Sequence, residues 1–423
     1  MASIYVESYG CSLNHADTQA MLTLLRNAQF EIVDKPEMAE LIIVNTCTVK
    51  SPTEKKILKR IHELNKFKKP IIIAGCLPQA DPTNPALAGF SLLGVFQINR
   101  VVEIVEETLN GNTVVLLAYG EYNRLDIPHY NPNKVIDIVP ICQGCLGDCS
   151  YCIVKKARGN LVSYKPEAII RRVKQAVNFG YREIWLTAQD TGAYGKDIGT
   201  SLPRLLKKLT ELQGDFLMRV GMANPNFIHD FLDELIEVLN SPKLFKFLHL
   251  PLQSGNNEIL RRMKRSYKAE QFIEIVEKLR RNIPKITIAT DVICGFPGET
   301  TKQFQETIDV IKRTKPDVLN ISRFWPRPGT RAAKLTGYSG NLTKARSRKL
   351  TKIFNDLAFK NNLNWIGWQG KVLIDTKGKF GSWQGRNFAY KPVVVLSDEE
   401  LLGKEVAVKI VDVTAHDLRA KIV

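Results

Sequence analysis

The chain has 423 residues, of which 44% are hydrophobic and 24% are charged, and its formal net charge at pH 7 is +17. This composition is ordinary for a globular protein of two or three domains, and no apolar run reaches the ~18 residues of a membrane-spanning helix. The start lacks the basic and apolar regions of a signal peptide, so we expect a cytoplasmic protein with reduced thiols. The excess of basic residues predicts a polyanionic partner, most simply nucleic acid; the alternatives are a generally basic proteome or a role of the charge in solubility.

The first 120 residues alternate apolar strand-like runs with helical stretches. This alternation predicts a doubly wound parallel α/β domain over residues 1–120. Its three strand-like runs each end in a cysteine, so three thiols about 30 residues apart can converge at the carboxyl edge of one sheet. Three separate core cysteines are the alternative. The runs are 3–11, 41–47 and 70–76, ending in Cys11, Cys47 and Cys76, and the helices are predicted over 16–28 and 51–67.

Residues 121–134 contain two prolines and no apolar periodicity, which predicts an interdomain linker. A second series of six βα units follows over 135–364 and predicts a (β/α)6 open barrel of TIM type. In such a barrel the chemistry lies at the carboxyl ends of the strands. The strands are predicted over 135–141, 182–188, 215–221, 245–251, 285–293 and 317–325. The main helices between them are predicted over 167–179, 202–212, 228–239, 269–281 and 301–314.

From residue 365 the pattern changes to short β segments separated by Gly, Ser and Asp turns. The segments cover 369–377, 387–397, 404–414 and 417–423, with no helix between them. They predict a small all-β barrel over 365–423, of the kind that often binds oligonucleotides.

Four of the eight cysteines lie within eleven residues, directly after the first strand of the second series. Two Cys-x2-Cys pairs fit zinc, but structural zinc sites usually take their pairs from separate turns, and these pairs stand three residues apart. A thioredoxin-like redox pair would normally open a helix in a different fold, and a disulfide cluster does not suit a reducing compartment. The four are Cys142, Cys145, Cys149 and Cys152.

The spacing Cys145-x3-Cys149-x2-Cys152 resembles the signature loop of radical S-adenosylmethionine enzymes. The resemblance implies that these thiolates bind three irons of a 4Fe–4S cluster, and that S-adenosylmethionine chelates the open fourth iron. One electron then cleaves the cofactor to a 5′-deoxyadenosyl radical. Cys142 is left over, and we expect it to be a small buried residue.

Motifs along the whole chain resemble the methylthiotransferase family. They are YGCSLNHAD, NTCTV and AGC near the N-terminus, GCLGDCSYC, TDVICGFPGET and RPGTRAA in the barrel, and GRNFAYKPVVV in the tail. The tail resembles the TRAM domain, an RNA-binding β-barrel. The resemblance implies a radical S-adenosylmethionine barrel and a second 4Fe–4S cluster on Cys11, Cys47 and Cys76.

YGCSLNHAD and CLGDCSYC look most like the archaeal and eukaryotic branch, which acts on threonylcarbamoyladenosine beside the anticodon of tRNA. This resemblance implies a tRNA-modifying enzyme that replaces the adenine C2–H with a methylthio group. One S-adenosylmethionine molecule would methylate sulfur associated with the N-terminal cluster, and a second would provide the radical. An electron donor and a sulfur source are then required as partners. The rival readings are methylthiolation of a ribosomal protein aspartate and a zinc-stabilised RNA-binding protein without catalysis.

Residues near the carboxyl ends of the barrel strands are the predicted cofactor contacts, although a satisfied structural polar group is about as common there. Tyr151, between two cluster cysteines, resembles the aromatic that packs near the cofactor's adenine, and Cys294 is expected in the core. In the tail, cationic and aromatic side chains are predicted to bind phosphate and stack on bases, with surface decoration as the alternative. The cofactor set is Tyr151, Gln189, Asp190, Arg219, Asn224, His249, Gln253 and Asp291; the RNA set is Arg386, Tyr390 and Lys391.

Overall fold

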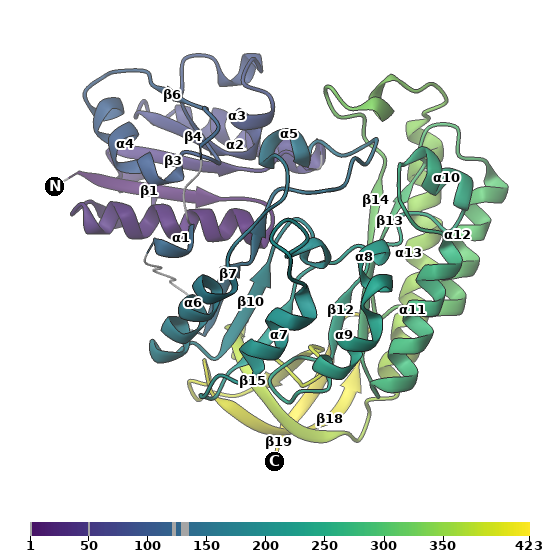
Figure 1. Ribbon diagram of the computed structural model, residues 1–423. Coiled ribbons are helices and arrows are strands. Elements are labelled where there is room, and N and C mark those ends of the chain that lie inside the picture. The colour runs from purple at the N-terminus through teal and green to yellow at the C-terminus, as the bar shows by residue number, and fades with distance from the viewer. Residues whose placement is uncertain (1, 50, 121–123, 128–134) are drawn as a thin grey trace.

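The fold is described from a computed structural model, which covers residues 2–49, 51–120, 124–127 and 135–423. The N-terminal α/β unit lies at one end of the molecule, the yellow C-terminal barrel lies at the other, and the central strands and helices lie between them (Figure 1). The predicted division at residues 120, 134 and 364 remains a prediction.

The N-terminal unit is a six-stranded parallel sheet in the order β2-β1-β3-β4-β5-β6. Apolar residues of α1 and α4 pack with residues of the sheet in one buried cluster, and those of α2 pack in another. The predicted doubly wound arrangement is therefore confirmed. The strands are β1 Ser3–Ser8, β2 Glu31–Val33, β3 Leu41–Thr46, β4 Ile71–Gly75, β5 Ser91–Gly94 and β6 Val115–Leu116; the helices are α1 Ser12–Asn27, α2 Ser51–Asn65, α3 Cys76–Ala80 and α4 Val101–Leu109.

The central unit contains all six predicted strands, arranged as two parallel three-stranded sheets in the orders β11-β10-β7 and β12-β13-β14. A bridge between Met218 and Leu244 joins the two sheets along one side, which gives the expected open barrel. One large apolar core lies between the strands and the helices that cover them. The strands are β7 Ile136–Pro140, β10 Glu183–Thr187, β11 Leu217–Val220, β12 Phe247–His249, β13 Thr287–Cys294 and β14 Val318–Arg323.

The helices of the central unit follow the predicted order. The helix expected over 228–239 is divided at Phe231 into two short helices. The helices are α5 Val154–Arg158, α6 Pro166–Asn178, α7 Leu202–Thr210, α8 Pro225–Asp230, α9 Leu232–Leu239, α10 Asn257–Arg262, α11 Ala269–Asn282 and α12 Thr301–Thr314. Among the described residues, every helix is too short or too polar to cross a membrane.

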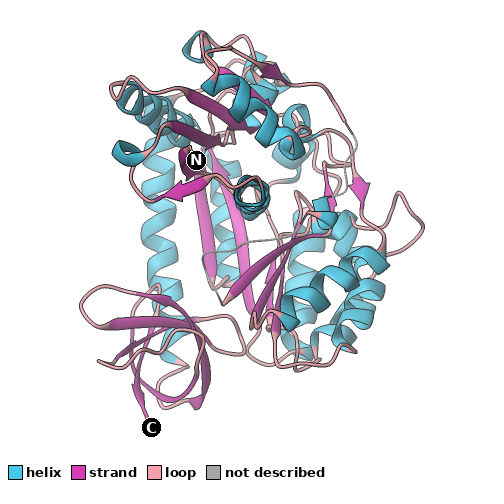
Figure 2. Ribbon diagram, turned by 90° about the vertical axis from the view of Figure 1, so that its left-hand side faces the viewer, coloured by secondary structure: helices cyan, strands magenta, loops and turns pink. Residues whose placement is uncertain are grey.

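The C-terminal unit follows the long helix α13 Gly340–Leu363 and is a closed barrel in the order β15-β16-β17-β19-β18. Figure 2 shows this barrel at the foot of the molecule, beside the C-terminus. Its core is built from alternating residues such as Val372, Ile374, Val393 and Val395. The strands are β15 Gln369–Lys377, β16 Ser382–Arg386, β17 Pro392–Leu396, β18 Glu405–Val413 and β19 Leu418–Ile422.

The predicted linker over 121–134 lies outside the described residues except for 124–127. These four residues are packed: Leu125 belongs to the apolar core of the central unit, and Ile127 belongs to that of the N-terminal unit. This short segment therefore connects the two cores.

Candidate metal centres

The three N-terminal thiols follow adjacent strands, because β1, β3 and β4 are neighbours in the sheet. Cys11 is the N-cap residue of α1, Cys47 follows β3 directly, and Cys76 begins α3. Gly10 has a φ of +110°, and a Cβ at that position would lie 2.8 Å from the Cβ of Cys47. The segment that carries Cys11 therefore approaches Cys47 so closely that only glycine fits at position 10. The predicted gathering of these thiols at one sheet edge is confirmed.

Burial controls the ionisation of the inner two thiols. It raises the pKa of Cys47 to about 12, and the neighbouring Cys76 and Cys11 add to the rise. Burial also raises the pKa of Cys76, while the guanidinium of Arg158 opposes the rise. Without a metal group these two thiols are neutral at pH 7, and binding one would release their protons.

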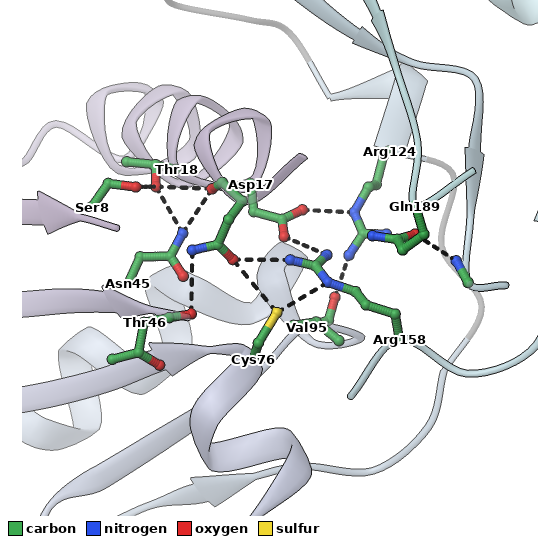
Figure 3. A network of polar contacts seen from close by, with 12 residues as sticks. Ser8, Asp17, Thr18, Asn45, Thr46, Cys76, Val95, Arg124, Arg158 and Gln189 are labelled. Carbon is green, nitrogen blue, oxygen red and sulfur yellow. Dashed lines mark hydrogen bonds and ion pairs between the residues drawn. The ribbon is translucent and has the colours of Figure 1, made fainter. Parts of the chain in front are cut away.

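A buried polar network surrounds Cys76 (Figure 3). Arg158 donates from Nε to Cys76 Sγ at 3.3 Å and from Nη2 to Asn14 Oδ1 at 2.9 Å. Its Nη1 lies 2.6 Å from Asp17 Oδ2, and Arg124 Nε lies 2.9 Å from the other oxygen of the same carboxylate. All of these side chains are buried. Arg158 ends α5, so it reaches the N-terminal site from the central unit.

The second thiol set lies in the loop between β8 (Cys142–Gln143) and α5. The backbone N–H of Gly147 donates to Cys145 Sγ at 3.2 Å. A Cβ on Gly147 would lie 3.3 Å from Cys145 Sγ and 3.8 Å from Cys149 Sγ, so the glycine keeps the space between these sulfurs open. The loop is anchored where the N–H of Ser150 donates to the carbonyl of Met263 at 3.0 Å.

Arg265 contacts this second set and was not predicted from the sequence. Its Nη1 donates to Cys149 Sγ at 3.4 Å, and its Nη2 donates to Asn224 Oδ1 and to the carbonyl of Pro251. Each thiol set therefore has one arginine within hydrogen-bond distance of a sulfur. Neither arginine belongs to a motif that spacing could identify.

The chemistry of both donor sets suits an iron–sulfur cluster. Burial raises the pKa of Cys145 to about 11 and that of Cys152 to about 12, so these thiols, too, are neutral until a metal replaces their protons. Within the described residues, no three Cys, His, Asp or Glu side chains are arranged to hold a metal ion. All eight cysteines are free thiols in the structure.

A cavity of about 190 Å³ lies next to Cys152 at the carboxyl ends of the barrel strands. Three predicted cofactor residues, Tyr151, Gln253 and Asp291, line it, together with Val49 of the N-terminal unit. His249 Nε2 lies 3.0 Å from Asp291 Oδ2, and Asn320 Nδ2 donates to Asp291 Oδ1 at 2.8 Å. The structure therefore brings these predicted residues together beside the second thiol set.

Three further predicted cofactor residues form hydrogen bonds to other groups of the protein near the same loop. They are Gln189, Asp190 and Asn224. Gln189 Oε1 accepts from the N–H of Gly144 at 2.8 Å, which fixes the start of the loop. Asp190 is fully buried and accepts from the backbone and the side chain of Asn224. Burial raises the pKa of Asp190, and its bonds to Asn224 oppose the rise. These contacts support the loop; direct contact with a cofactor stays a prediction.

Arg219 differs from its predicted position. Its guanidinium lies 5.0 Å from the ring of Trp185, 5.3 Å from that of Phe247 and 5.4 Å from that of Tyr390 of the C-terminal barrel. Cation–π contacts hold it there, on the side of the central unit that the C-terminal barrel covers. These contacts do not support the predicted contact of Arg219 with the cofactor, which stays a prediction.

Two of the three predicted RNA-binding residues, Tyr390 and Lys391, are buried, and Arg386 is half-buried. Tyr390 is 8% exposed and packs against Phe245 and Phe247, and Lys391 is 4% exposed. Lys391 Nζ lies 2.8 Å from Asp317 Oδ1, and Arg386 Nε lies 3.1 Å from Asp375 Oδ2. Tyr390 and Lys391 therefore attach the barrel to the central unit, and the structure does not support their predicted contact with RNA. Arg386 pairs within the barrel itself, and its contact with RNA stays a prediction.

Cys142 and Cys294 are both fully buried in the main core, as expected. Cys142 Sγ lies 3.8 Å from the carbonyl oxygen of Asp190, on the inner side of the loop.

Three family models match successive parts of the chain. Residues 3–88 match "Uncharacterized protein family UPF0004", residues 139–311 match the radical SAM superfamily, and residues 370–423 match the TRAM domain. In fold, the chain is similar to the radical S-adenosylmethionine methyltransferase TsrM from Kitasatospora setae, solved with cobalamin and a 4Fe–4S cluster. The TM-score is 0.59 at 14% identity, over 78% of this chain and 74% of that chain.

Relatives with higher identity cover nearly the whole chain. A probable threonylcarbamoyladenosine tRNA methylthiotransferase from Pyrococcus horikoshii is 45% identical over 398 residues, which is 93% of this chain and 94% of that protein. The human threonylcarbamoyladenosine tRNA methylthiotransferase is 40% identical over 428 residues, which is 99% of this chain and 73% of that protein. The chain therefore belongs to the threonylcarbamoyladenosine tRNA methylthiotransferase family.

Proposed function

We propose that this protein adds a methylthio group to C2 of threonylcarbamoyladenosine beside the anticodon of tRNA. One observation carries the proposal: a single apolar cluster joins one thiol of the N-terminal set to the segment that directly follows the loop set. Ile153, directly after Cys152, packs in the same buried cluster as Cys76. A radical-generating loop and a second sulfur-rich site are thus neighbours, as a reaction that joins sulfur, a methyl group and a substrate carbon requires.

The residues present fit two iron–sulfur clusters. Cys145, Cys149 and Cys152 would hold one, and the N-terminal thiols Cys11, Cys47 and Cys76 would hold the other. Tyr151, Gln253 and Asp291 are the proposed contacts of S-adenosylmethionine. When bound, the clusters and S-adenosylmethionine supply the one-electron chemistry, the radical and the methyl group.

The protein itself contributes orientation and exclusion of water. His249 and Asn320 hold the carboxylate of Asp291 from two sides, so both of its oxygens have a fixed direction. Arg265 donates to Cys149 Sγ, and the N–H of Gly147 donates to Cys145 Sγ, where it opposes the rise in pKa that burial causes. Ile153 and Ala157 exclude water from the space beside Cys76.

The partners follow from the chemistry and the charge. A net charge of +17 suits a tRNA substrate, and the relatives reported above are named for tRNA, which favours tRNA over a ribosomal protein. We further propose an electron donor and a sulfur source as separate partners, and the cytoplasm as the location. A zinc-stabilised RNA-binding protein without catalysis would not need the cavity beside Cys152.

Nucleoside mass spectrometry of tRNA from a strain that lacks this protein tests the proposal. The methylthio derivative of threonylcarbamoyladenosine should be absent, and the unmethylthiolated nucleoside should accumulate. Wild-type protein should restore it, whereas Cys149→Ala should not and Cys142→Ala should. An unchanged nucleoside profile in the deletion strain would reject the function.

A further inference from the structure

The guanidinium of Arg158 is held in one orientation by two residues of α1. Nη1 contacts the carboxylate of Asp17 at 2.6 Å and Nη2 contacts Asn14 at 2.9 Å, which leaves the Nε edge directed at Cys76 Sγ, 3.3 Å away. Arg158 is 1% exposed. Bonds to Tyr9 and Thr46 fix Asn14 in turn.

The cation comes from the loop that carries the other thiol set. Arg158 stands six positions after Cys152, at the end of α5. α5 packs against α3, which begins with Cys76. A change in the position of this loop therefore moves the cation that faces a sulfur of the N-terminal site.

An arginine remains charged at any pH at which the protein is folded, and a charge in a buried site acts over a low dielectric. A hydrogen bond to a ligand sulfur and a nearby positive charge both favour the more negative, reduced form of an iron–sulfur cluster, and so raise its reduction potential. Asp17 lowers the reduction potential, because its carboxylate lies in the same network and its negative charge disfavours the reduced form.

We propose that Arg158 is a positioning residue that orients Cys76 and raises the reduction potential of the cluster bound by Cys11, Cys47 and Cys76. The proposal rests on the assignment of these cysteines as cluster ligands under the proposed function. It links the two sites physically: the segment that follows the radical loop sets the electrostatics of the N-terminal cluster.

A purely structural ion pair is the alternative, and the two explanations differ in what they predict. If Arg158 only ties the units together, its loss lowers thermal stability without a defined effect on potential. If Arg158 tunes the cluster, loss of the cation and loss of the carboxylate of Asp17 shift the potential in opposite directions.

The test uses the full-length protein with Cys145→Ala, Cys149→Ala and Cys152→Ala, so that only the N-terminal set can bind a cluster. After anaerobic reconstitution, a redox titration followed by electron paramagnetic resonance gives the midpoint potential. Arg158→Gln should shift it to lower potential, and Arg158→Lys, which keeps the charge but loses the planar fork, should lie between Arg158→Gln and the parent. Lys156→Gln removes an exposed cation from the same helix and should match the parent.

Asp17→Asn provides the opposite test and should shift the midpoint to higher potential. The Asp17→Asn variant also tests the proposal if Arg158→Gln fails to fold or to retain iron. Equal midpoints in the parent, Arg158→Gln and Asp17→Asn would overturn the proposal, and so would shifts of the same sign. A parent that binds no cluster would instead refute the assignment of the three N-terminal cysteines as ligands.

Discussion

Cys142 stands three positions before Cys145, yet the two thiols have different surroundings. Cys142 is fully buried in the main core, and its Sγ faces the carbonyl of Asp190. Cys145 lies in the loop, where its Sγ accepts from Gly147. The end of the short strand β8 at Gln143 separates the two environments. Cys142 therefore serves packing, and we propose Cys145 as a metal ligand.

Iron analysis tests this division. Wild-type protein should bind about eight irons, from four per cluster. Replacing Cys145, Cys149 and Cys152 together by alanine should leave about four, because the N-terminal set remains. Cys142→Ala is the matched control: it should retain the full iron content and lose about 1 kcal/mol of stability, as is typical of a small core substitution. Loss of iron from Cys142→Ala would make Cys142 a ligand.

The cysteines were predictable because spacing and position after a strand carry the signal. Arg158 was not, because its contact with Cys76 joins residues 82 positions apart, and its contact with Asn14 joins residues 144 apart. Such contacts depend on how two units pack. The same reason explains two positions that the sequence did not indicate: Arg219 was predicted as a cofactor contact and Lys391 as a phosphate contact, and both lie where the central unit meets the C-terminal barrel.

At the level of elements, β10 begins with a buried acid. Glu183 is fully buried, and burial, followed by the charge of Asp375, raises its pKa to about 7, although hydrogen bonds from Trp185 and Tyr390 oppose the rise. Because the ordinary value is 4.5, the folded protein retains this proton at pH values where the unfolded chain has lost it.

The contribution of Glu183 to the stability of the protein should consequently fall as pH rises from about 4.5 to about 7, by up to about 1.4 kcal/mol for each unit of the pKa difference. Glu183→Gln removes the titrating group. The melting temperature of Glu183→Gln minus that of wild type should therefore increase as pH rises across this range. A difference that is constant with pH would contradict the raised pKa.

The turn between β16 and β17 attaches the C-terminal barrel through Lys391, whose ammonium group pairs with Asp317 and Asn362. Removing one partner of a buried ion pair typically costs about 3–5 kcal/mol, so Lys391→Ala should lower the melting temperature strongly. The salt dependence of tRNA binding should stay unchanged, because Lys391 is not available to phosphate.

Lys379 is the matched control, since it is exposed on the β15–β16 turn of the same barrel. Lys379→Ala should leave stability unchanged and, if this turn meets the RNA, reduce the slope of log affinity against log salt by about one. A reduced slope with normal stability for Lys391→Ala would restore its predicted role in binding.

Some strands can be predicted from the hydrophobic pattern of the sequence alone, and others cannot. Long apolar strands such as β3 and β13 were predicted, and all six strands of the central unit were found. β16 was missed, because Ser-Trp-Gln-Gly-Arg has a single strongly strand-favouring residue. It forms because β15 and β17 pair with it on both sides, and Gly385 permits close contact with the backbone of Leu373.

At the scale of the whole molecule, Cys76 shares a buried cluster with Ile153 of the loop segment, but the two thiol sets should be separable in function. Cys76→Ala should stop methylthiolation yet leave reductive cleavage of S-adenosylmethionine measurable, because the loop set stays intact. Cys149→Ala should stop both. Chromatography of 5′-deoxyadenosine from the same reactions measures the difference. Loss of 5′-deoxyadenosine from a folded Cys76→Ala protein that retains the loop cluster would show that the N-terminal set is needed for radical formation.

The central claim is that this chain, with both thiol sets loaded, methylthiolates threonylcarbamoyladenosine in tRNA. The most direct test incubates the anaerobically reconstituted full-length protein with S-adenosylmethionine, a reductant, a sulfide source and tRNA that carries this nucleoside. Nucleoside mass spectrometry should show a product heavier by one methylthio group in place of one hydrogen, and none with tRNA that lacks the threonylcarbamoyl group. Cleavage of S-adenosylmethionine without any methylthiolated nucleoside, under conditions in which both clusters are present, would contradict the account.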